Sequence, residues 1–248
     1  MSSISTTAPQ RSDAWFVTTH WSVVLSAGHS DTPRAAEALQ RLCQTYWYPL
    51  YTYVRRRGYS PQDAQDLTQG FFACLLERQS LATADPEKGR FRSFMLGAMN
   101  YFLATEWAKM QTQKRGGGRE IFSLDLAAAE QRFDLESADH ATPDKAFDQA
   151  WATALLDKVL SQLEAEFRRE GKIQLFDMLK QTLTGSRESQ PYGVLAAQLS
   201  INEGAVKTAV HRLRKRYRQL LEAEIANTVT SPGEVKEEMR YLLKAAAD

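Results

Sequence analysis

The chain has 248 residues, enough for one large domain or two small domains with hydrophobic cores of their own. Its 31 Lys and Arg nearly balance its 30 Asp and Glu, so contact with nucleic acid would have to come from local basic patches. No apolar run approaches the length of a membrane span, and the first residues lack the apolar segment of a secretory signal. We therefore expect a cytoplasmic protein without a membrane partner.

Apolar residues recur at helical spacing along nearly the whole chain while strand signals are weak, so the sequence predicts an all-α fold. A first helical domain is expected over residues 18–115. Its first long helix should start at Pro33, and Pro49 should kink or break it. Cys43 and Cys74 lie among apolar residues without metal-ligand spacing, so we expect buried thiols.

A second helix of this domain is expected to start after Ser60 and to bury one apolar stripe. The stripe consists of Ala64, Leu67, Phe71, Cys74 and Leu75. The solvent-facing side should carry Asp66, Gln69 and Gly70. A glycine inside a helix costs about 1 kcal/mol relative to alanine, so Gly70 indicates either the close approach of a partner or drift at a surface position.

A loop over residues 79–90 leads into a long helix that combines basic with aromatic residues. Between residues 86 and 119 there are seven Lys and Arg against two acids. This combination suits single-stranded nucleic acid, because bases stack on rings while cations hold the backbone. The competing interpretation is that the rings fill the core, so only one or two of five should face solvent. The five rings are Phe91, Phe94, Tyr101, Phe102 and Trp107.

Residues 116–150 are expected to form a flexible, acidic linker. Three glycines open the segment, it shows no sustained apolar period, and residues 120–150 contain eight acids against two basic residues. A second helical domain should follow over residues 151–225. Residues 226–248 form a C-terminal extension with one amphipathic helix, whose role the sequence does not reveal.

Residues 192–218 predict two short helices joined by a tight turn. The second helix should start after Asn202, which is a good N-cap, and bury one stripe. That stripe consists of Val206, Val210, Leu213, Tyr217 and Leu220. The first helix should bury Val194, Leu195 and Leu199. Residues 203–218 contain six Lys and Arg against one acid, so the exposed side of the second helix is basic.

A recognition helix places its N-terminal side chains on base edges in the major groove and its basic flank on phosphates. We expect base contacts from Glu203, Lys207, Thr208 and His211. Phosphate contacts, which add affinity but little specificity, are expected from Arg212, Arg214, Lys215 and Arg216. The competing interpretation is a solvated basic helix in an ordinary bundle.

Two parts of the chain, in this order and at this separation, resemble a bacterial RNA polymerase sigma factor of the extracytoplasmic-function group. Residues 63–77, followed by residues 91–109, are similar to sigma region two. Residues 192–216 are similar to the helix-turn-helix of sigma region four, and residues 18–28 look like one branch of the group. The fold implied is two helical domains joined by a linker.

The resemblance implies a protein that binds core RNA polymerase and promoter DNA and directs promoter recognition and melting. The helix over residues 63–77 would bind the polymerase clamp through Asp66 and Gln69, although Gly70 stands where the family usually has glutamate. The first domain would hold the melted minus-ten element as a single strand, and the second would read the minus-thirty-five element as duplex. The candidates for single-strand contact are Lys88, Arg90, Arg92 and Asn100. The resemblance leaves open whether an anti-sigma factor or the C-terminal extension holds the chain inactive.

Catalysis by the chain itself is not expected, and neither is a cofactor or a metal. The four histidines are scattered, and no glycine-rich phosphate loop with a lysine is present. The alternative function is a free-standing helix-turn-helix regulator, which would usually dimerise on a symmetric site. A protein-interaction module is a third reading, and it predicts no salt-dependent affinity for DNA.

Overall fold

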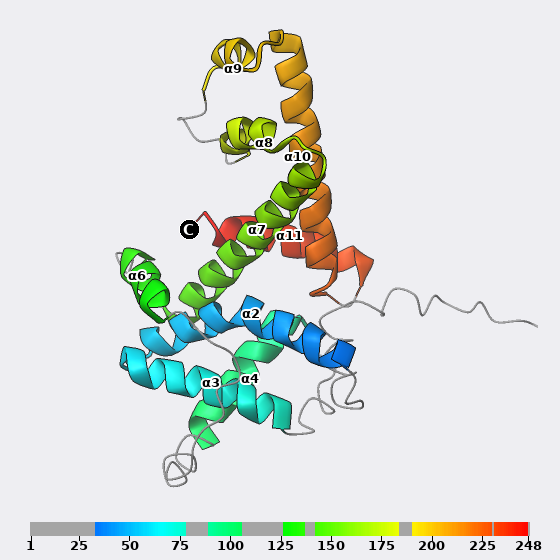
Figure 1. Ribbon diagram of the computed structural model, residues 1–248. Helices are drawn as coiled ribbons and strands as arrows, with labels where there is room; N and C mark the ends of the chain where they lie inside the picture. Colours follow the sequence, from blue (N-terminus) through cyan, green and yellow to red (C-terminus); the bar gives the residue numbers. More distant parts are fainter. Residues whose placement is uncertain are drawn as a thin grey trace, which may run out of the picture.

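The computed structural model contains only helices in the part of the chain that it describes, which confirms the all-α expectation (Figure 1). Nine α-helices and two short 3₁₀ helices are present within this part. None of these helices combines the length and the apolar character needed to cross a membrane. The described residues are 33–77, 89–105, 126–136, 142–183, 190–229 and 231–247.

The larger hydrophobic cluster is built mainly from α2 (Pro33–Arg56), α3 (Pro61–Glu77), α4 (Phe91–Thr105) and the first half of α7 (Pro143–Arg169). Its fully buried side chains include Tyr46, Tyr51, Phe72, Phe91 and Trp151. Helix α2 continues through the proline at position 49 and is not broken by it. The residues around that proline are buried, so tertiary packing offsets the lost backbone hydrogen bond.

The segment expected to be a flexible linker contains regular structure where it is described. Helix α6 (Leu126–Glu136) packs on α2, and α7 already begins at residue 143. Phe133 of α6 lies under two guanidinium groups, those of Arg55 and Arg56, at 4.7 and 5.3 Å. Only two residues of α6 are buried, so its apolar pattern is too short to stand out in an acidic sequence. The expectation of a flexible segment is corrected for these residues, while the division into two domains stays a prediction.

A second, smaller cluster joins the other half of α7 to three helices. They are α8 (Ile173–Leu179), α9 (Tyr192–Leu199) and α10 (Glu203–Ala226). The 3₁₀ helix η4 (Lys180–Thr182) directly follows α8. The long helices α7 and α10 contribute side chains to both clusters, and Figure 1 shows them running from α2 up to α8 and α9. The orientation of α9 and α10 therefore depends on packing in both clusters.

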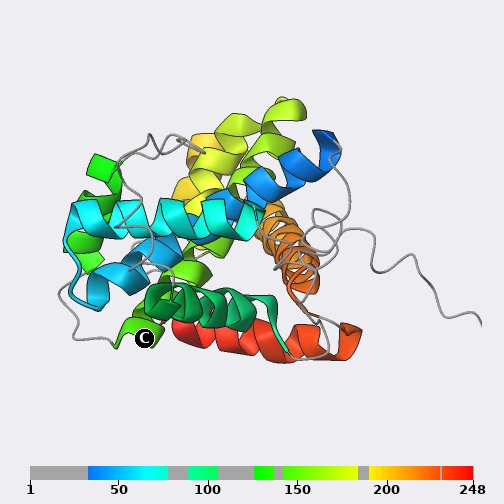
Figure 2. The same ribbon diagram turned by 90° about the horizontal axis from the view of Figure 1, so that it is seen from below.

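The C-terminal extension is part of the folded core. After a 3₁₀ turn, η5 (Pro232–Glu234), helix α11 (Val235–Ala245) packs against α7 and α10. Its Leu242 is fully buried in the larger cluster. Seen from below, α11 runs beside α4 (Figure 2), and the two helices share the ion pairs described below. The amphipathic helix expected here is therefore present, and it covers part of the larger cluster.

Candidate nucleic-acid interface

The turn between α9 and α10 reverses the chain in three residues and caps both helices. Ser200 adopts the left-handed conformation with φ of 56°, and the N–H of Ile201 donates to the carbonyl of Ala196 at 3.1 Å. Asn202 is extended, and its side-chain oxygen accepts a hydrogen bond of 2.8 Å from the N–H of Ala205. The N-cap predicted from the sequence is thus confirmed, and the first turn of α10 is firmly set.

The buried side of this helix pair agrees with the predicted stripe in α10 and differs in α9. Val206, Val210 and Leu213 are buried, while the last two residues of the stripe are partly buried. In α9, Leu195 is buried as predicted, but Val194 is 44% exposed. Ala196 is buried in its place, because a helix as short as α9 packs only one narrow face against α10.

All eight side chains predicted to contact duplex DNA are exposed on α10. They are Glu203, Lys207, Thr208, His211, Arg212, Arg214, Lys215 and Arg216. The first half of α10 lies with α9 at the end of the molecule opposite α3 and α4 (Figure 1). Exposure alone does not make them equivalent, because some of them already have partners within the protein.

Two of the predicted phosphate contacts are used inside the protein. The guanidinium of Arg214 donates hydrogen bonds of 3.1 and 2.6 Å to the carbonyl of Thr182, which ties α10 to η4. Arg216 donates to both carboxylate oxygens of Glu166 on α7, one bond being 2.7 Å long. These hydrogen bonds hold the pKa of Glu166 below its ordinary value. Both arginines therefore stabilise the orientation of α10 before any DNA is bound.

Four other residues of the predicted interface have no such partner. Lys207, His211, Arg212 and Lys215 make no hydrogen bond or ion pair with any residue in the described ranges. Three of them follow one another at intervals of four residues, so they form a single row along α10. We call these four residues the α10 basic row. The charges of Lys207, Arg212 and Lys215 are available to a polyanion without the loss of an internal contact.

The remaining two members of the set lie at the first turns of α10. The hydroxyl of Thr208 donates to the carbonyl of Gly204 at 2.9 Å. Glu203 lies at the helix start, where a negative charge is favourable, and a Cβ placed on Gly193 would lie 3.0 Å from its carboxylate. Gly193 thus leaves room for this side chain against α9. Both residues remain exposed, so a base contact stays a prediction for each.

The residues predicted to hold the single strand do not form an open surface. Lys88 lies outside the described residues. Arg92 is buried and Arg90 partly buried, and both are engaged with helix α11. The side chain of Asn100 accepts hydrogen bonds of 2.5 Å from Tyr53 and 2.8 Å from Arg57. Packing of α4 against α2 and α11 thus engages Arg90, Arg92 and Asn100 inside the protein, and their contact with single-stranded DNA stays a prediction.

The aromatic residues of α4 mostly fill the core, as the competing interpretation expected. Phe91 and Phe102 are buried and Phe94 is partly buried, whereas Tyr101 is 65% exposed. Trp107 lies outside the described residues. One of the four described rings is therefore clearly available for stacking on a base.

The residues predicted to bind polymerase lie on α3 but are less exposed than expected. Asp66 and Gln69 are partly buried, and Gly70 is buried, so its predicted place on the solvent-facing side is wrong. Cys74 of the predicted stripe is only partly buried, and α3 buries Thr68 and Phe72 in addition. The reason is that α3 packs against α2, α4 and α6 and so buries more than one face.

The sequence analysis did not anticipate the network around Glu238 on α11. This carboxylate is fully buried and lies between the guanidinium groups of Arg90 and Arg92. Arg92 also donates to Asp148 of α7 at 2.8 Å, and Tyr241 donates a short hydrogen bond to the same carboxylate. A signal was present, since Glu238 interrupts the apolar stripe of the C-terminal helix. Almost no glutamate is fully buried unless it is paired.

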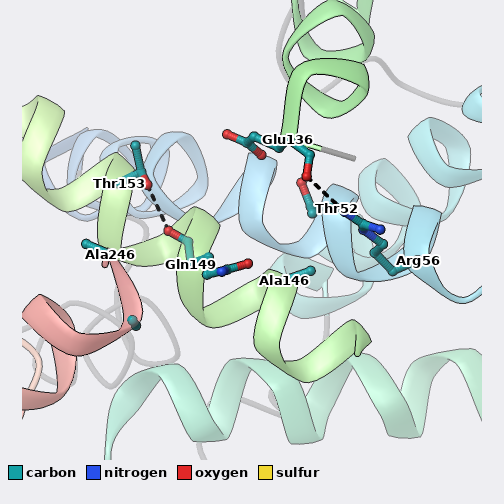
Figure 3. Close-up of a pocket in the computed structure, with 8 residues that line it drawn as sticks. Thr52, Arg56, Glu136, Ala146, Gln149, Thr153 and Ala246 are labelled. Carbon is teal, nitrogen blue, oxygen red and sulfur yellow. Dashed lines mark hydrogen bonds between the residues drawn. The ribbon is translucent and has the colours of Figure 1, made fainter. Parts of the chain in front are cut away.

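A pocket of about 200 Å³ lies away from α9 and α10, where α2, α6, α7 and the end of α11 meet (Figure 3). Arg56 donates to the backbone carbonyl of Glu136 at 3.1 Å, and the hydroxyl of Thr153 donates to the carbonyl of Gln149 at 3.0 Å. The first of these hydrogen bonds joins α2 to α6, and the second lies within α7. The pocket therefore gives little indication of a reactive site.

No group of three or more His, Cys, Asp or Glu in the described ranges is placed to hold a metal ion. No family model, curated protein or solved structure matches the chain. The strongest functional feature is thus the α10 basic row on a capped helix-turn-helix.

Proposed function

We propose that this chain is a sigma factor, which binds core RNA polymerase and directs promoter recognition and melting. The observation that carries the proposal is the α10 basic row, which lies exposed and unpartnered among the described residues on the helix that follows the capped turn. A helix presented in this way can enter the major groove with its first turns on base edges and its basic flank on phosphates. Such a protein works in the cytoplasm and needs no cofactor.

The sigma function is preferred over a free-standing regulator because of what precedes the helix-turn-helix. Residues 63–77 and 91–109 resemble sigma region two, and they precede the region-four resemblance of residues 192–216 in the order and at the separation of that family. In the described residues, this part forms the α2–α3–α4 packing that carries Asp66, Gln69 and the exposed ring of Tyr101. A regulator that only binds duplex DNA has no use for such a block.

The direct test mixes the purified chain with sigma-free bacterial core polymerase and separates the species by size-exclusion chromatography. Co-elution at submicromolar concentration is the expected result. Separate elution, with the chain still binding duplex DNA on its own, would instead favour the free-standing regulator. Separate elution without any salt-dependent DNA affinity would favour the protein-interaction module.

A charge reversal on α3 locates the contact with polymerase. Asp66→Arg should abolish co-elution, because it places a cation on the helix that is proposed to meet the polymerase clamp. Asp134→Arg is the matched control, since it makes the same charge change at an exposed position of α6. Far-ultraviolet circular dichroism checks that both variants are folded. Undiminished co-elution of folded Asp66→Arg contradicts the proposed role of α3.

A further inference from the structure

The start of α4 contains an anion-binding seat that is already occupied. Nε of Arg92 donates to Oε1 of Glu238 at 2.8 Å, and Nε of Arg90 lies 2.9 Å from Oε2 of the same carboxylate. Glu238 belongs to α11, and 146 positions in the chain separate it from Arg92. We call Arg90 and Arg92 the arginine seat. Two guanidinium groups around one carboxylate also match the charge of a phosphate between two arginines.

Helix α11 is held over the arginine seat by more than this carboxylate. The ring of Tyr241 lies 4.0 Å from the guanidinium of Arg92, and its hydroxyl donates to Asp148. The N–H of Phe91 donates to the carbonyl of Thr228, in the segment that leads to α11, at 3.3 Å. Figure 2 shows α11 lying along α4. The first turn of α4 is therefore covered by the C-terminal part of the chain.

The cover is imperfect on the side of Arg90. Oε2 of Glu238 has no well-aligned hydrogen bond to any described residue, although Arg90 is close enough for a charge contact. The side chain of Arg90 is 29% exposed, and its second acidic neighbour, Glu237, is 66% exposed and 3.7 Å away. A buried carboxylate without all of its hydrogen bonds is unfavourable. The packing of α11 over the arginine seat is therefore weaker than it would be with Glu238 fully bonded. A competing anion can approach the seat from this side.

We propose that α11 is an autoinhibitory element that keeps single-stranded DNA from the arginine seat, with Glu238 in the place of a backbone phosphate. The inference rests on the proposed function, since it assigns Arg90 and Arg92 to the melted strand. In the closed state these arginines neutralise Glu238. When α11 leaves, Arg90 loses both of its carboxylate partners and Arg92 keeps only Asp148, so the arginine seat can take a phosphate. Binding of the single strand and release of α11 are then linked, because a phosphate of the strand and the carboxylate of Glu238 cannot occupy the arginine seat at the same time.

The test measures single-strand binding by the full chain in the absence of polymerase. The probe is a fluorescein-labelled oligothymidylate of about 20 nucleotides, long enough to span one binding site, read by fluorescence anisotropy at several salt concentrations. Glu238→Gln keeps the shape of the side chain and removes its charge, so we expect at least tenfold tighter binding. The salt dependence should steepen by about 0.7, the contribution on a single strand of the one phosphate that takes the place of Glu238.

Two further variants show whether the gain comes from the arginine seat. Adding Arg92→Gln to Glu238→Gln should return the affinity and the salt dependence to those of the unchanged chain. Glu170→Gln is the matched control, because it removes one carboxylate from an exposed ion pair with Lys172. The control should leave single-strand binding unaltered. A folded Glu238→Gln that binds no tighter than the unchanged chain overturns the proposal.

A milder variant covers the case in which Glu238→Gln does not fold. Tyr241→Phe removes only the hydroxyl that binds Asp148, so the fold should be kept while the hold on α11 weakens. We expect a two- to threefold gain in affinity for the oligothymidylate. Hydrogen exchange on the same variant should show faster exchange in residues 235–245 when the oligonucleotide is added. Unaltered affinity together with unaltered exchange would sink the proposal.

The same variants separate this inference from the proposed function. A gain in single-strand affinity without co-elution with core polymerase supports the autoinhibitory role and contradicts the sigma function. Co-elution of the unchanged chain, with no gain for any folded variant, supports the sigma function and overturns the autoinhibitory role.

Discussion

The two basic regions of this protein look alike in sequence and differ in the folded state. On α10, Lys207, Arg212 and their neighbours in the α10 basic row are exposed and have no partner among the described residues. At the start of α4, Arg90 and Arg92 are paired with carboxylates and largely covered by α11. The first region is ready to meet a polyanion, whereas the second must first lose an internal anion.

The difference teaches that the charge of a segment and the availability of that charge have separate origins. Charge is a property of residue type, and it is visible in the chain as printed. Availability depends on which remote carboxylates the fold brings near, as Glu166 does for Arg216 and Glu238 for Arg92. The number of Lys and Arg in a segment therefore exceeds the number of side chains that can hold DNA.

The largest expected effect is a difference in stability between a substitution at the start of α4 and one on α10. Arg92→Ala should lower the free energy of unfolding by about 3 kcal/mol, because it leaves the buried carboxylate of Glu238 with one poorly aligned partner. Arg212→Ala should change it by less than about 0.5 kcal/mol, since that side chain is exposed. Urea unfolding followed by circular dichroism measures both. Equal losses of unfolding free energy in the two variants would mean that the buried ion pairs of Arg92 do not contribute to stability.

The next effect concerns which DNA is preferred. Lys207→Ala should alter the choice of minus-thirty-five sequence by about 1–3 kcal/mol at one position, because a base contact discriminates by that amount. Binding to a set of duplexes that differ at single base pairs gives the measurement. If Lys207→Ala weakens all duplexes to the same extent, the residue contacts a phosphate and not a base.

A third effect lies within α10 and compares two neighbouring arginines. Arg212→Ala should reduce the salt dependence of duplex binding by about 0.9, the contribution of one phosphate contact. Arg214→Ala should leave the salt dependence nearly unaltered and instead lower stability, because its guanidinium holds the carbonyl of Thr182. Lys215→Ala should behave like Arg212→Ala. A reduced salt dependence of duplex binding in Arg214→Ala would show that this arginine leaves the carbonyl of Thr182 when DNA binds.

Much of the fold follows from local patterns. The start of α10 could be predicted, because Asn202 and the stripe of Val206, Val210 and Leu213 are all encoded within a dozen residues. The short helix α6 could not, since its stability comes from remote contacts such as the ion pair of Glu130 with Arg55 at 2.8 Å. Local periodicity carries no information on such partners.

The candidate site shows the same division. The exposed side of α10 was predictable, because it is the complement of a well-defined buried stripe. The pairing of the arginine seat could not be predicted, because its partner is a carboxylate from the far end of the chain. The burial of Gly70 was also missed, since a stripe on α3 reveals one buried side and says nothing of a second. Tertiary packing, and not propensity, decides these positions.

The smallest expected effect comes from releasing Arg216 of α10 from its partner, so that it becomes as available as the residues of the α10 basic row. Glu166→Gln removes the carboxylate that holds Arg216, so the salt dependence of duplex binding should steepen by up to about 0.9 and the affinity should rise two- to threefold. The cost in stability should stay below about 0.5 kcal/mol, because both partners are partly exposed.

The stability cost of Glu166→Gln should also depend on pH in a defined direction. The hydrogen bonds from Arg216 lower the pKa of Glu166, so the pair stabilises the folded state above the unfolded pKa of about 4.3. That contribution is lost as the pH falls through the lower folded pKa, and the two proteins should then unfold alike. Unfolding curves recorded in steps from about pH 7 down into the acid range below about pH 4.3 provide the comparison. A variant that gains no affinity for duplex DNA would show that Arg216 does not face the phosphates even when it is released.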